Sequence, residues 1–353
     1  MVGLPYPVII EPGALGGLED VVRGAGPGNR IVVVTDTNVA KRFGSRVARR
    51  LGAVTLTIAP GEKHKNRKTW ATLTDRMLAA RLGRDTTLVA VGGGVVGDIA
   101  GFVAATFMRG IPFVQVPTTL MAMVDASVGG KTGVDTRHGK NLVGAFHQPA
   151  AVVIDPDVLA TLSPDHLRAG YAEVIKHGVV ADAAYFERVR AFGPQLGRRR
   201  GGDDLTGIVR HSVGIKASIV SRDERESGLR KVLNFGHTIG HAVEAARKYR
   251  VLHGHAVAVG MVVESRIAER LSIAAAGTAA SVEDACRAAG LPTAPKGVTP
   301  AGLIRFTRSD KKARGGRTEY ALPARIGTMA GGESGWSVPV EETIVREVLS
   351  NFA

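Results

Sequence analysis

Four of the ten histidines of this chain gather in one stretch, "LNFGHTIGHAVEAARKYRVLHGHAVAVGM", residues 233–261. His237 and His241 lie four residues apart, so a helix would place both imidazoles on one face. This pair suits either a metal site or one metal ligand beside an acid–base group. The motif is not that of a zincin, in which a glutamate follows the first histidine, because Thr238 stands at that position.

Two further histidines, His253 and His255, end the same stretch, and His253 could turn back toward His237. A catalytic zinc ion takes three protein ligands and keeps one position open. The third candidate is Glu173 in "GYAEVIKHG", an acidic residue in an apolar helical pattern with Lys176 one turn later. Histidines with ordinary satisfied hydrogen bonds are the alternative, and the pattern alone leaves both interpretations open.

A second candidate site lies in "VAVGGGVVGDIAGFVAA" (89–105), where three glycines follow a strand-like run and Gly97 comes early in a helix-like one. Glycine lets the backbone approach a phosphate, and a helix N-terminus offers unpaired N–H groups to an anion. The spacing differs from the G-x-G-x-x-G dinucleotide fingerprint. A tight turn that binds nothing is therefore the alternative.

Two other strand-like runs also end in polar residues. Asp36 in "TDTN" (35–38) could hold a ribose diol, and "PGEKHK" (60–65) follows the run "VTLTIAP". Ligands of parallel α/β sheets bind at the carboxyl ends of the strands. Three polar strand ends on one sheet therefore predict a ligand site at that edge.

The segment 117–149 has too many glycines for one helix and is too apolar for a free linker. It carries Asp125, Lys131, Lys140 and Asn141. Lysines beside flexible backbone are a common anion cradle. An ordered surface loop with solvated lysines is the alternative interpretation.

The elements that must position these residues differ between the two halves of the chain. Short β-branched runs alternate with helical patterns in the first half, which predicts a doubly wound parallel α/β layer. The strand-like runs are 30–36, 86–94, 112–119 and 151–156, and the helix-like ones include 68–83 and 95–110. Beyond a boundary near 155–165 the pattern becomes mainly helical, in segments such as 165–181, 203–221, 237–248 and 255–272.

Composition narrows the class of protein. Lys and Arg exceed Asp and Glu by 14 charges, but the only dense basic run, "GRRRGG" (197–202), is typical of a solvated loop. The scattered charge favours small anionic ligands over nucleic acid. The lone Cys286 excludes an intrachain disulfide and a cysteine-built zinc site. With no apolar run of membrane-spanning length and no signal-peptide pattern, we expect a cytoplasmic protein without membrane contact.

Taken together, the motifs resemble the 3-dehydroquinate synthase family of sugar phosphate cyclases. They are "GGGVVGDIAGFVAATFMRGIPFVQVPTTLMAMVDASVGGKTGV", "GKNLVGAFHQP", "AEVIKHG", "LNFGHTIGHA" and "SDKK". The resemblance implies a Rossmann-like NAD-binding domain at 1–157 and a helical metal- and substrate-binding domain at 158–353. It also implies an active site between the domains and a homodimer.

The resemblance further implies roles for individual residues. The zinc ligands would be Glu173, His237 and His253, with cobalt as an alternative ion. The NAD contacts would be Asp36, Asn38, Pro60, Gly61, Glu62, Lys63, His64, Lys65, Gly94, Val95, Val96, Gly97, Asp98, Thr118, Thr119, Lys131, Lys140, Val158, Leu159, Ala160 and Thr161. The catalytic and substrate-binding set would be Arg109, Asp125, Lys131, Asn141, Lys176, Lys216, Arg230, Asn234, His241 and either Lys311 or Lys312. The family usually reads H-G-E where this chain has His253-Gly254-His255.

The implied substrate is an anionic sugar phosphate, 3-deoxy-D-arabino-heptulosonate 7-phosphate. Transient oxidation by NAD, phosphate elimination, re-reduction and aldol closure would convert it to 3-dehydroquinate, a step of the shikimate pathway to aromatic amino acids. Either His241 or the substrate's own phosphate would take the C6 proton. The alternatives are a related cyclase such as 2-deoxy-scyllo-inosose synthase, or a metal-dependent polyol dehydrogenase that releases NADH. A nucleic-acid-binding protein would leave Glu173 and the histidines unexplained.

Overall fold

The computed structural model describes residues 3–26, 30–197, 202–311 and 318–352. The chain divides into two compact units. Unit 1 comprises Met1–Leu162 and Gly201–Val213, and unit 2 comprises Ser163–Arg200 and Gly214–Ala353.

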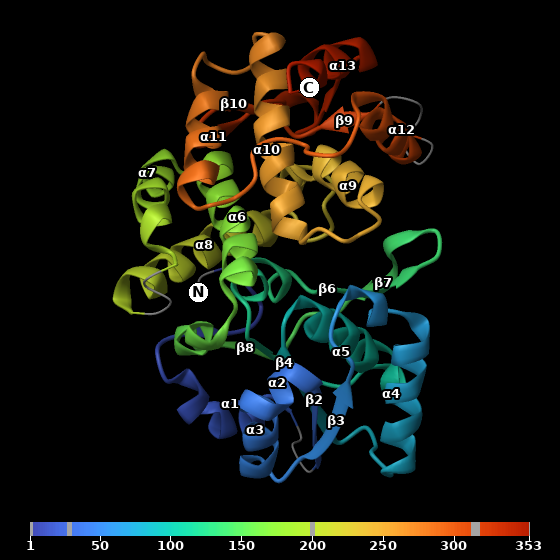
Figure 1. Cartoon of the computed structure of the whole chain (residues 1–353). Helices are drawn as coiled ribbons and strands as arrows, with labels where there is room; N and C mark the ends of the chain where they lie inside the picture. The colour runs from blue at the N-terminus through green and yellow to red at the C-terminus, as the bar shows by residue number, and fades with distance from the viewer. Residues whose placement is uncertain (1–2, 27–29, 198–201, 312–317, 353) are drawn as a thin grey trace. The chain divides into compact units, whose positions relative to one another are not determined.

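Unit 1 contains a six-stranded parallel sheet in the order β1-β8-β5-β4-β2-β3 (Figure 1). In that order the strands are Val8–Ile10, Ala151–Ile154, Phe113–Pro117, Thr86–Gly92, Arg30–Asp36 and Val54–Ile58. The predicted parallel sheet is confirmed. The sequence interpretation missed β1, because three residues are too few to show a periodic pattern.

Helices cover both faces of this sheet. Val32 and Val34 of β2 pack with α4 and α5 on one side, while Ile31 and Val33 pack with α1 and α3 on the other. This alternation is what a strand buried on both faces requires. The helices are α1 Leu18–Gly24, α2 Thr37–Val39, α3 Ser45–Arg50, α4 Arg67–Ala79 and α5 Gly94–Thr106.

The glycine-rich segment 117–149 forms two structures. A π-helical turn spans Ala122–Ala126, and an antiparallel hairpin follows, made of β6 (Lys131–Thr136) and β7 (Gly139–Phe146). The segment is therefore neither one helix nor a free linker, as the glycine and apolar content predicts. The pairing itself was not predicted.

Unit 2 is mainly helical (Figure 1, green to red). Its helices include α6 Pro164–Ala181, α7 Ala183–Phe192, α9 His237–Ala246, α10 His253–Arg270, α11 Thr278–Ala288, α12 Pro300–Lys311 and α13 Glu342–Ser350. The helix α8, Asp203–Arg222, begins in unit 1 and ends in unit 2. Two small antiparallel sheets complete the unit, β9 (Glu319–Tyr320) with β12 (Val338–Pro339) and β10 (Pro323–Arg325) with β11 (Thr328–Met329).

The predicted fold class, a Rossmann-like parallel sheet domain and a mainly helical domain, is confirmed. A buried apolar cluster joins α9, α10, α12 and α13 in unit 2. None of the helices in the described part of the chain is long and apolar enough to cross a membrane.

Candidate active site

Unit 2 brings together the three residues of the predicted zinc site, Glu173, His237 and His253, which we call the metal centre. Glu173 Oε1 lies 3.8 Å from His237 Nε2 and 3.7 Å from His253 Nε2. Both distances are too long for hydrogen bonds. Two ligands at about 2.1 Å from a tetrahedral zinc ion would be about 3.4 Å apart, so the spacing fits a shared metal ion.

The burial and hydrogen bonding of the Glu173 carboxylate also favour a bound metal ion. The residue is fully buried, and within the described residues its Oε1 accepts no hydrogen bond. Its other oxygen, Oε2, lies 2.5 Å from the Nζ atom of Lys176, which is itself 1% exposed. A buried carboxylate oxygen without a donor is unfavourable, and a cation bound there would satisfy it.

A close helix contact holds the metal centre together. His253 is the first residue of α10, and the Gly254 backbone after it lies against the Ala169 backbone of α6. A Cβ atom at Gly254 would meet the Ala169 carbonyl oxygen at 1.8 Å, so only glycine fits. Glu173 follows Ala169 by one helical turn, and this contact therefore brings His253 to Glu173.

In both histidines of the metal centre, the ring nitrogen that points away from Glu173, Nδ1, faces a hydrogen-bond acceptor. His253 Nδ1 lies 3.3 Å from Glu244 Oε2, and His237 Nδ1 lies 3.2 Å from the Phe235 carbonyl oxygen. With Nδ1 protonated, Nε2 is the lone-pair nitrogen that can bind a metal. The sequence interpretation did not select Glu244, although it stands two helical turns after His237 and so on the same face of the predicted helix.

Neutral histidines are the form that binds a metal. Burial and the nearby Lys176 ammonium lower the pKa of His237 well below its ordinary value. Burial also lowers the pKa of His255, whose charged neighbours Asp165 and Arg168 lie near the start of α6. His255 is not among the side chains that converge on Glu173.

A second missed residue, Glu264 of α10, holds the N-terminus of α9, where His237 lies. Its carboxylate accepts hydrogen bonds from the Gly236 N–H (2.6 Å) and the Ile239 N–H (3.0 Å). The helix has no capping side chain of its own at Gly236. Burial raises the pKa of Glu264 to about 8, although these backbone N–H groups lower it. The sequence does carry a signal for Glu264, because it is an acidic residue inside the apolar helical pattern of 255–272.

The other predicted catalytic residues of unit 2 lie on several elements. His241 is exposed on α9, with its ring centroid 5.4 Å from that of His237 and 6.0 Å from that of His253. Lys216 is buried on α8. Lys311 is the last residue of α12, while Lys312 lies outside the described residues.

Arg230 and Asn234 belong to a tightly bonded loop after α8, whose last part, Leu229–Asn234, is a 3₁₀ helix. Arg230, 3% exposed, donates from Nη1 to the Glu224 carbonyl oxygen at 2.5 Å, and Asn234 Nδ2 donates to Glu226 Oε1 at 2.7 Å. The loop begins at Asp223, a residue that the sequence interpretation missed. Burial raises the pKa of Asp223, but hydrogen bonds from the backbone of Arg230 and its neighbours outweigh this and lower the pKa to about 2.

In unit 1, the strands β3, β2 and β4 are adjacent and parallel, so their three polar carboxyl ends lie on one edge of the sheet, as predicted. We call this the sheet edge, made of Asp36–Asn38, Pro60–Lys65 and Gly93–Asp98. Asp36 Oδ1 accepts hydrogen bonds from the backbone N–H groups of Asn38 and Val39. Gly93 is extended, and Gly94, Val95, Val96, Gly97 and Asp98 form the first turns of α5.

Charged residues of the sheet edge are paired with one another and with the hairpin. The Lys65 ammonium, 5% exposed, lies 2.5 Å from Asp98 Oδ2 and donates to Asn141 Oδ1 at 2.5 Å. Burial lowers the pKa of Lys65, but the nearby carboxylates, Asp98 first and then Glu62, together outweigh burial, so the net shift is upward. Lys140 lies 3.4 Å from Glu62 Oε1. These pairs fix β7 against the loop that follows β3.

The remaining predicted residues of unit 1 occupy other loops. Thr118 and Thr119 follow β5, and the Thr118 N–H donates to the Gly92 carbonyl. Arg109 is exposed with φ +68°, Asp125 lies in the π-helical turn, and Lys131 begins β6. Val158, Leu159, Ala160 and Thr161 form a 3₁₀ helix capped by Asp155, whose carboxylate also accepts from the Gly13 and Leu15 N–H groups.

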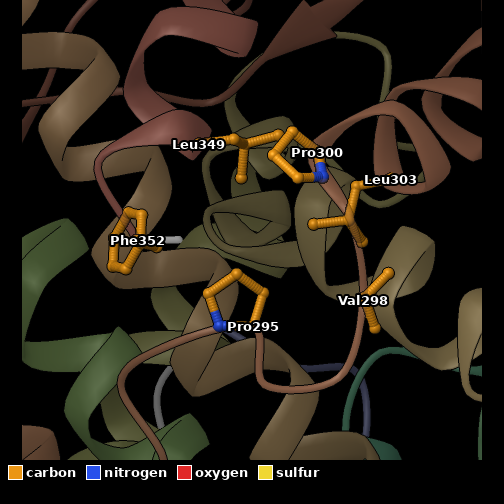
Figure 2. A pocket seen from close by; sticks show the side chains of 6 residues that line it. All are labelled: Pro295, Val298, Pro300, Leu303, Leu349 and Phe352. Carbon is orange, nitrogen blue, oxygen red and sulfur yellow. The ribbon is translucent and has the colours of Figure 1, made fainter.

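An apolar pocket in unit 2 is unrelated to these clusters. Figure 2 shows its six lining side chains, Pro295, Val298, Pro300, Leu303, Leu349 and Phe352. None of them carries a charge or a hydrogen-bonding side-chain group, so the lining does not suit an anionic substrate.

Comparisons with known proteins cover both halves of the chain. The family model described as 3-dehydroquinate synthase N-terminal matches residues 55–169, and the one described as 3-dehydroquinate synthase C-terminal matches residues 170–313. The 3-dehydroquinate synthase of Caulobacter vibrioides is 47% identical over 335 residues, which cover 91% of this chain and 90% of that protein.

Two solved structures are similar over nearly the whole chain. A 2-deoxy-scyllo-inosose synthase, complexed with carbaglucose-6-phosphate, NAD+ and Co2+, is 26% identical with a TM-score of 0.89, covering 99% of this chain and 97% of its own. The 2-epi-5-epi-valiolone synthase of Streptomyces hygroscopicus, with NAD+ and Zn2+ bound, is 28% identical with a TM-score of 0.88, covering 100% of this chain and 98% of its own.

Proposed function

Because this chain belongs to the 3-dehydroquinate synthase family, we propose that the residues described above carry out that family's reaction. The reaction converts 3-deoxy-D-arabino-heptulosonate 7-phosphate into 3-dehydroquinate and phosphate, with NAD reduced and reoxidised within one turnover. It makes the chain a phosphate-eliminating carbon–oxygen lyase. The observation that carries the proposal is the convergence of Glu173, His237 and His253 within a chain that both family models match.

Glu173, His237 and His253 would hold the divalent metal ion, zinc or cobalt, whose charge would polarise a substrate hydroxyl. The depressed pKa of His237 keeps its imidazole neutral at neutral pH, and the Phe235 carbonyl oxygen at Nδ1 leaves Nε2 as the unprotonated nitrogen. The Lys176 ammonium beside Glu173 Oε2 orients the carboxylate so that Oε1 faces both histidines. A dependence of activity on this metal follows from the proposal.

The sheet edge would hold NAD, which supplies a reversible hydride acceptor. The turn at Gly94–Asp98 offers the N-terminus of α5 to the pyrophosphate. Asp36 would accept hydrogen bonds from the ribose hydroxyls and would repel the 2′-phosphate of NADP. Comparable turnover with NADP and NAD at equal concentration would contradict this role of Asp36.

The substrate carries a carboxylate and a phosphate, and unit 2 offers buried cations. Lys176, Lys216 and Arg230 are 1%, 6% and 3% exposed. Charge-assisted hydrogen bonds from such groups are the strong ones in anion binding. His241 lies close to both metal-centre histidines but outside the ligand set, so it can accept a proton without leaving a metal.

The test is a redox balance. With excess heptulosonate phosphate, zinc and one equivalent of NAD, we expect many turnovers with phosphate released in step with substrate loss and no steady rise of NADH absorbance. NADH that accumulates one-for-one without phosphate release would instead indicate a polyol dehydrogenase. Because a solved 2-deoxy-scyllo-inosose synthase resembles this chain, glucose 6-phosphate should be offered in parallel, and its preferred consumption would contradict the proposed substrate.

We also propose that NAD binds within residues 1–157 together with Val158–Thr161, and that the metal ion and most of the substrate contacts lie within 158–353. We further propose that the chain is a cytoplasmic homodimer that binds no nucleic acid. Most of the basic run at 197–202 lies outside the described residues. The expected mass from light scattering is twice 37.0 kDa. Retention of the protein on heparin at physiological salt would support a nucleic-acid partner instead.

A further inference from the structure

The two histidines of the metal centre have different outer partners. His237 Nδ1 faces a neutral group, the Phe235 carbonyl oxygen, at 3.2 Å. His253 Nδ1 faces the Glu244 carboxylate at 3.3 Å. A carboxylate behind a ligand imidazole fixes the ring and makes it a more basic ligand than a carbonyl does.

We propose that Glu244 is a positioning residue of the metal centre, which holds the His253 ring through Nδ1 and strengthens its bond to the metal ion. The inference rests on the proposed metal site.

The surroundings of Glu244 fit this role. Its side chain is 2% exposed, and a buried carboxylate is stable only beside donors or cations. The α9 helix places it on the same face as His237, two turns along, while His253 comes from the start of α10. The carboxylate thus reaches the side of the His253 ring opposite to Glu173, which lies at Nε2.

A different use of the same residues is possible on distance alone. His241, Glu244 and His253 have ligand atoms within 4.8 Å of one another and could hold a second metal ion. That arrangement would require His253 to bind one ion through Nε2 and another through Nδ1, which would remove the hydrogen bond to Glu244. It would also place two cations on one imidazole, beside the Lys176 ammonium. The geometry therefore favours the positioning role.

The test compares Co2+ binding by the whole chain and its Glu244→Gln variant, measured by competition with a chelator. We expect one Co2+ per chain in both, with the affinity of the variant reduced about 10- to 100-fold. The ligand-field absorption bands of bound Co2+ should also shift, which a purely structural role of Glu244 would not cause. Glu244→Asp keeps the charge and should restore part of the affinity.

Glu269→Gln is the matched control. Glu269 is a partly buried carboxylate of α10 that accepts a hydrogen bond from the Ala279 backbone N–H. Its substitution by Gln therefore removes the same charge as Glu244→Gln but at a position outside the metal centre. Its Co2+ affinity and spectrum should match those of the wild type. The melting temperature of each metal-free variant checks that the fold is intact.

Three results would overturn the inference. Equal Co2+ affinity in Glu244→Gln and the control would leave the metal site in place and remove the role of Glu244. Two Co2+ ions per wild-type chain, with one lost in Glu244→Gln, would make Glu244 a ligand of a second ion. A wild-type chain that binds no Co2+ would overturn the metal site and, with it, this inference.

Discussion

The sheet edge of unit 1 and the metal centre of unit 2 use charged residues in opposite ways. At the sheet edge, opposite charges are already in contact, with the Lys65 ammonium 2.5 Å from Asp98. In the metal centre, three lone-pair groups face one another, with Glu173 Oε1 at 3.8 Å and 3.7 Å from the histidine Nε2 atoms of His237 and His253. The charges of the sheet edge are neutralised by one another, whereas Glu173 Oε1 and the two histidine nitrogens face a position that a cation would stabilise.

The two regions should therefore respond differently to the loss of their ligands. Paired charges hold backbone segments in place without a ligand, so the sheet edge should keep its structure when NAD leaves. Converging acceptors repel one another unless a metal ion lies between them, so removal of the metal should weaken unit 2 as well as stop the reaction. Substitutions in the two regions should therefore differ in whether they change stability, metal affinity or both.

The largest expected effect is loss of the metal ion. Chelation should reduce activity by at least about 10³-fold, because the metal supplies several kcal/mol of transition-state stabilisation. Added zinc or cobalt should restore it. His253→Ala should bind no metal, which elemental analysis of the purified protein would show.

The control for this prediction is His255→Ala, one residue beyond Gly254. His255 does not converge on Glu173, so its variant should keep one metal ion per chain. If His255→Ala loses the metal and His253→Ala keeps it, the ligand assignment is wrong.

At the sheet edge, the next largest effect should come from Lys65→Met. The change leaves Asp98 half-buried without its cation, and breaking such a pair costs about 3 kcal/mol of unfolding free energy. Lys140→Met breaks the more exposed pair with Glu62 and should cost less than about 1 kcal/mol. Urea unfolding of both variants measures the difference, and equal losses would show that burial does not set the strength of these pairs.

For the sheet edge, the sequence predicted the position of the polar residues but not the pairing of their charges. The sheet edge follows from strand runs and turn residues, because parallel strands bring their carboxyl ends together wherever the sheet forms. The pairing of Lys65 with Asp98 and Asn141 was not predicted, because it joins three segments whose contacts depend on the hairpin. The resemblance gave Lys65 and Asn141 only as NAD-binding and substrate-binding residues, respectively.

In the metal centre, the residue types and the helical spacing were enough to select Glu173, His237 and His253 as candidates. Glu244 and Glu264 were missed, because their partners are a ring nitrogen and backbone N–H groups on another helix. Such contacts depend on how helices pack and leave little trace in a single pattern.

The packing itself can be tested through Gly254→Ala. The added methyl group would overlap the Ala169 carbonyl oxygen and push α10 away from α6. We expect a loss of about 1–3 kcal/mol in unfolding free energy and weaker metal binding, because His253 moves with the helix start. Gly214→Ala in α8 is the control, since nothing lies within 4 Å of its added methyl, and it should be neutral or slightly stabilising. Unchanged metal affinity in Gly254→Ala would contradict the proposed role of this contact.

A pH-dependent effect on stability is expected from Glu264, which caps α9 beneath His237. Burial raises its pKa from 4.5 to about 8, so the folded chain holds a proton there that the unfolded chain releases above pH 4.5. The stability that depends on this proton is fully present below pH 4.5 and is lost as the pH rises through 8, with a slope of at most about 1.4 kcal/mol per pH unit. Glu264→Gln should remove this slope, whereas Glu269→Gln should keep it. Urea unfolding between pH 5 and pH 8 with a chelator present, which removes the pH dependence of metal binding, measures the slopes. If Glu264→Gln and the wild type keep parallel slopes, the carboxylate is ionised throughout, and the backbone N–H groups at the start of α9 outweigh its burial.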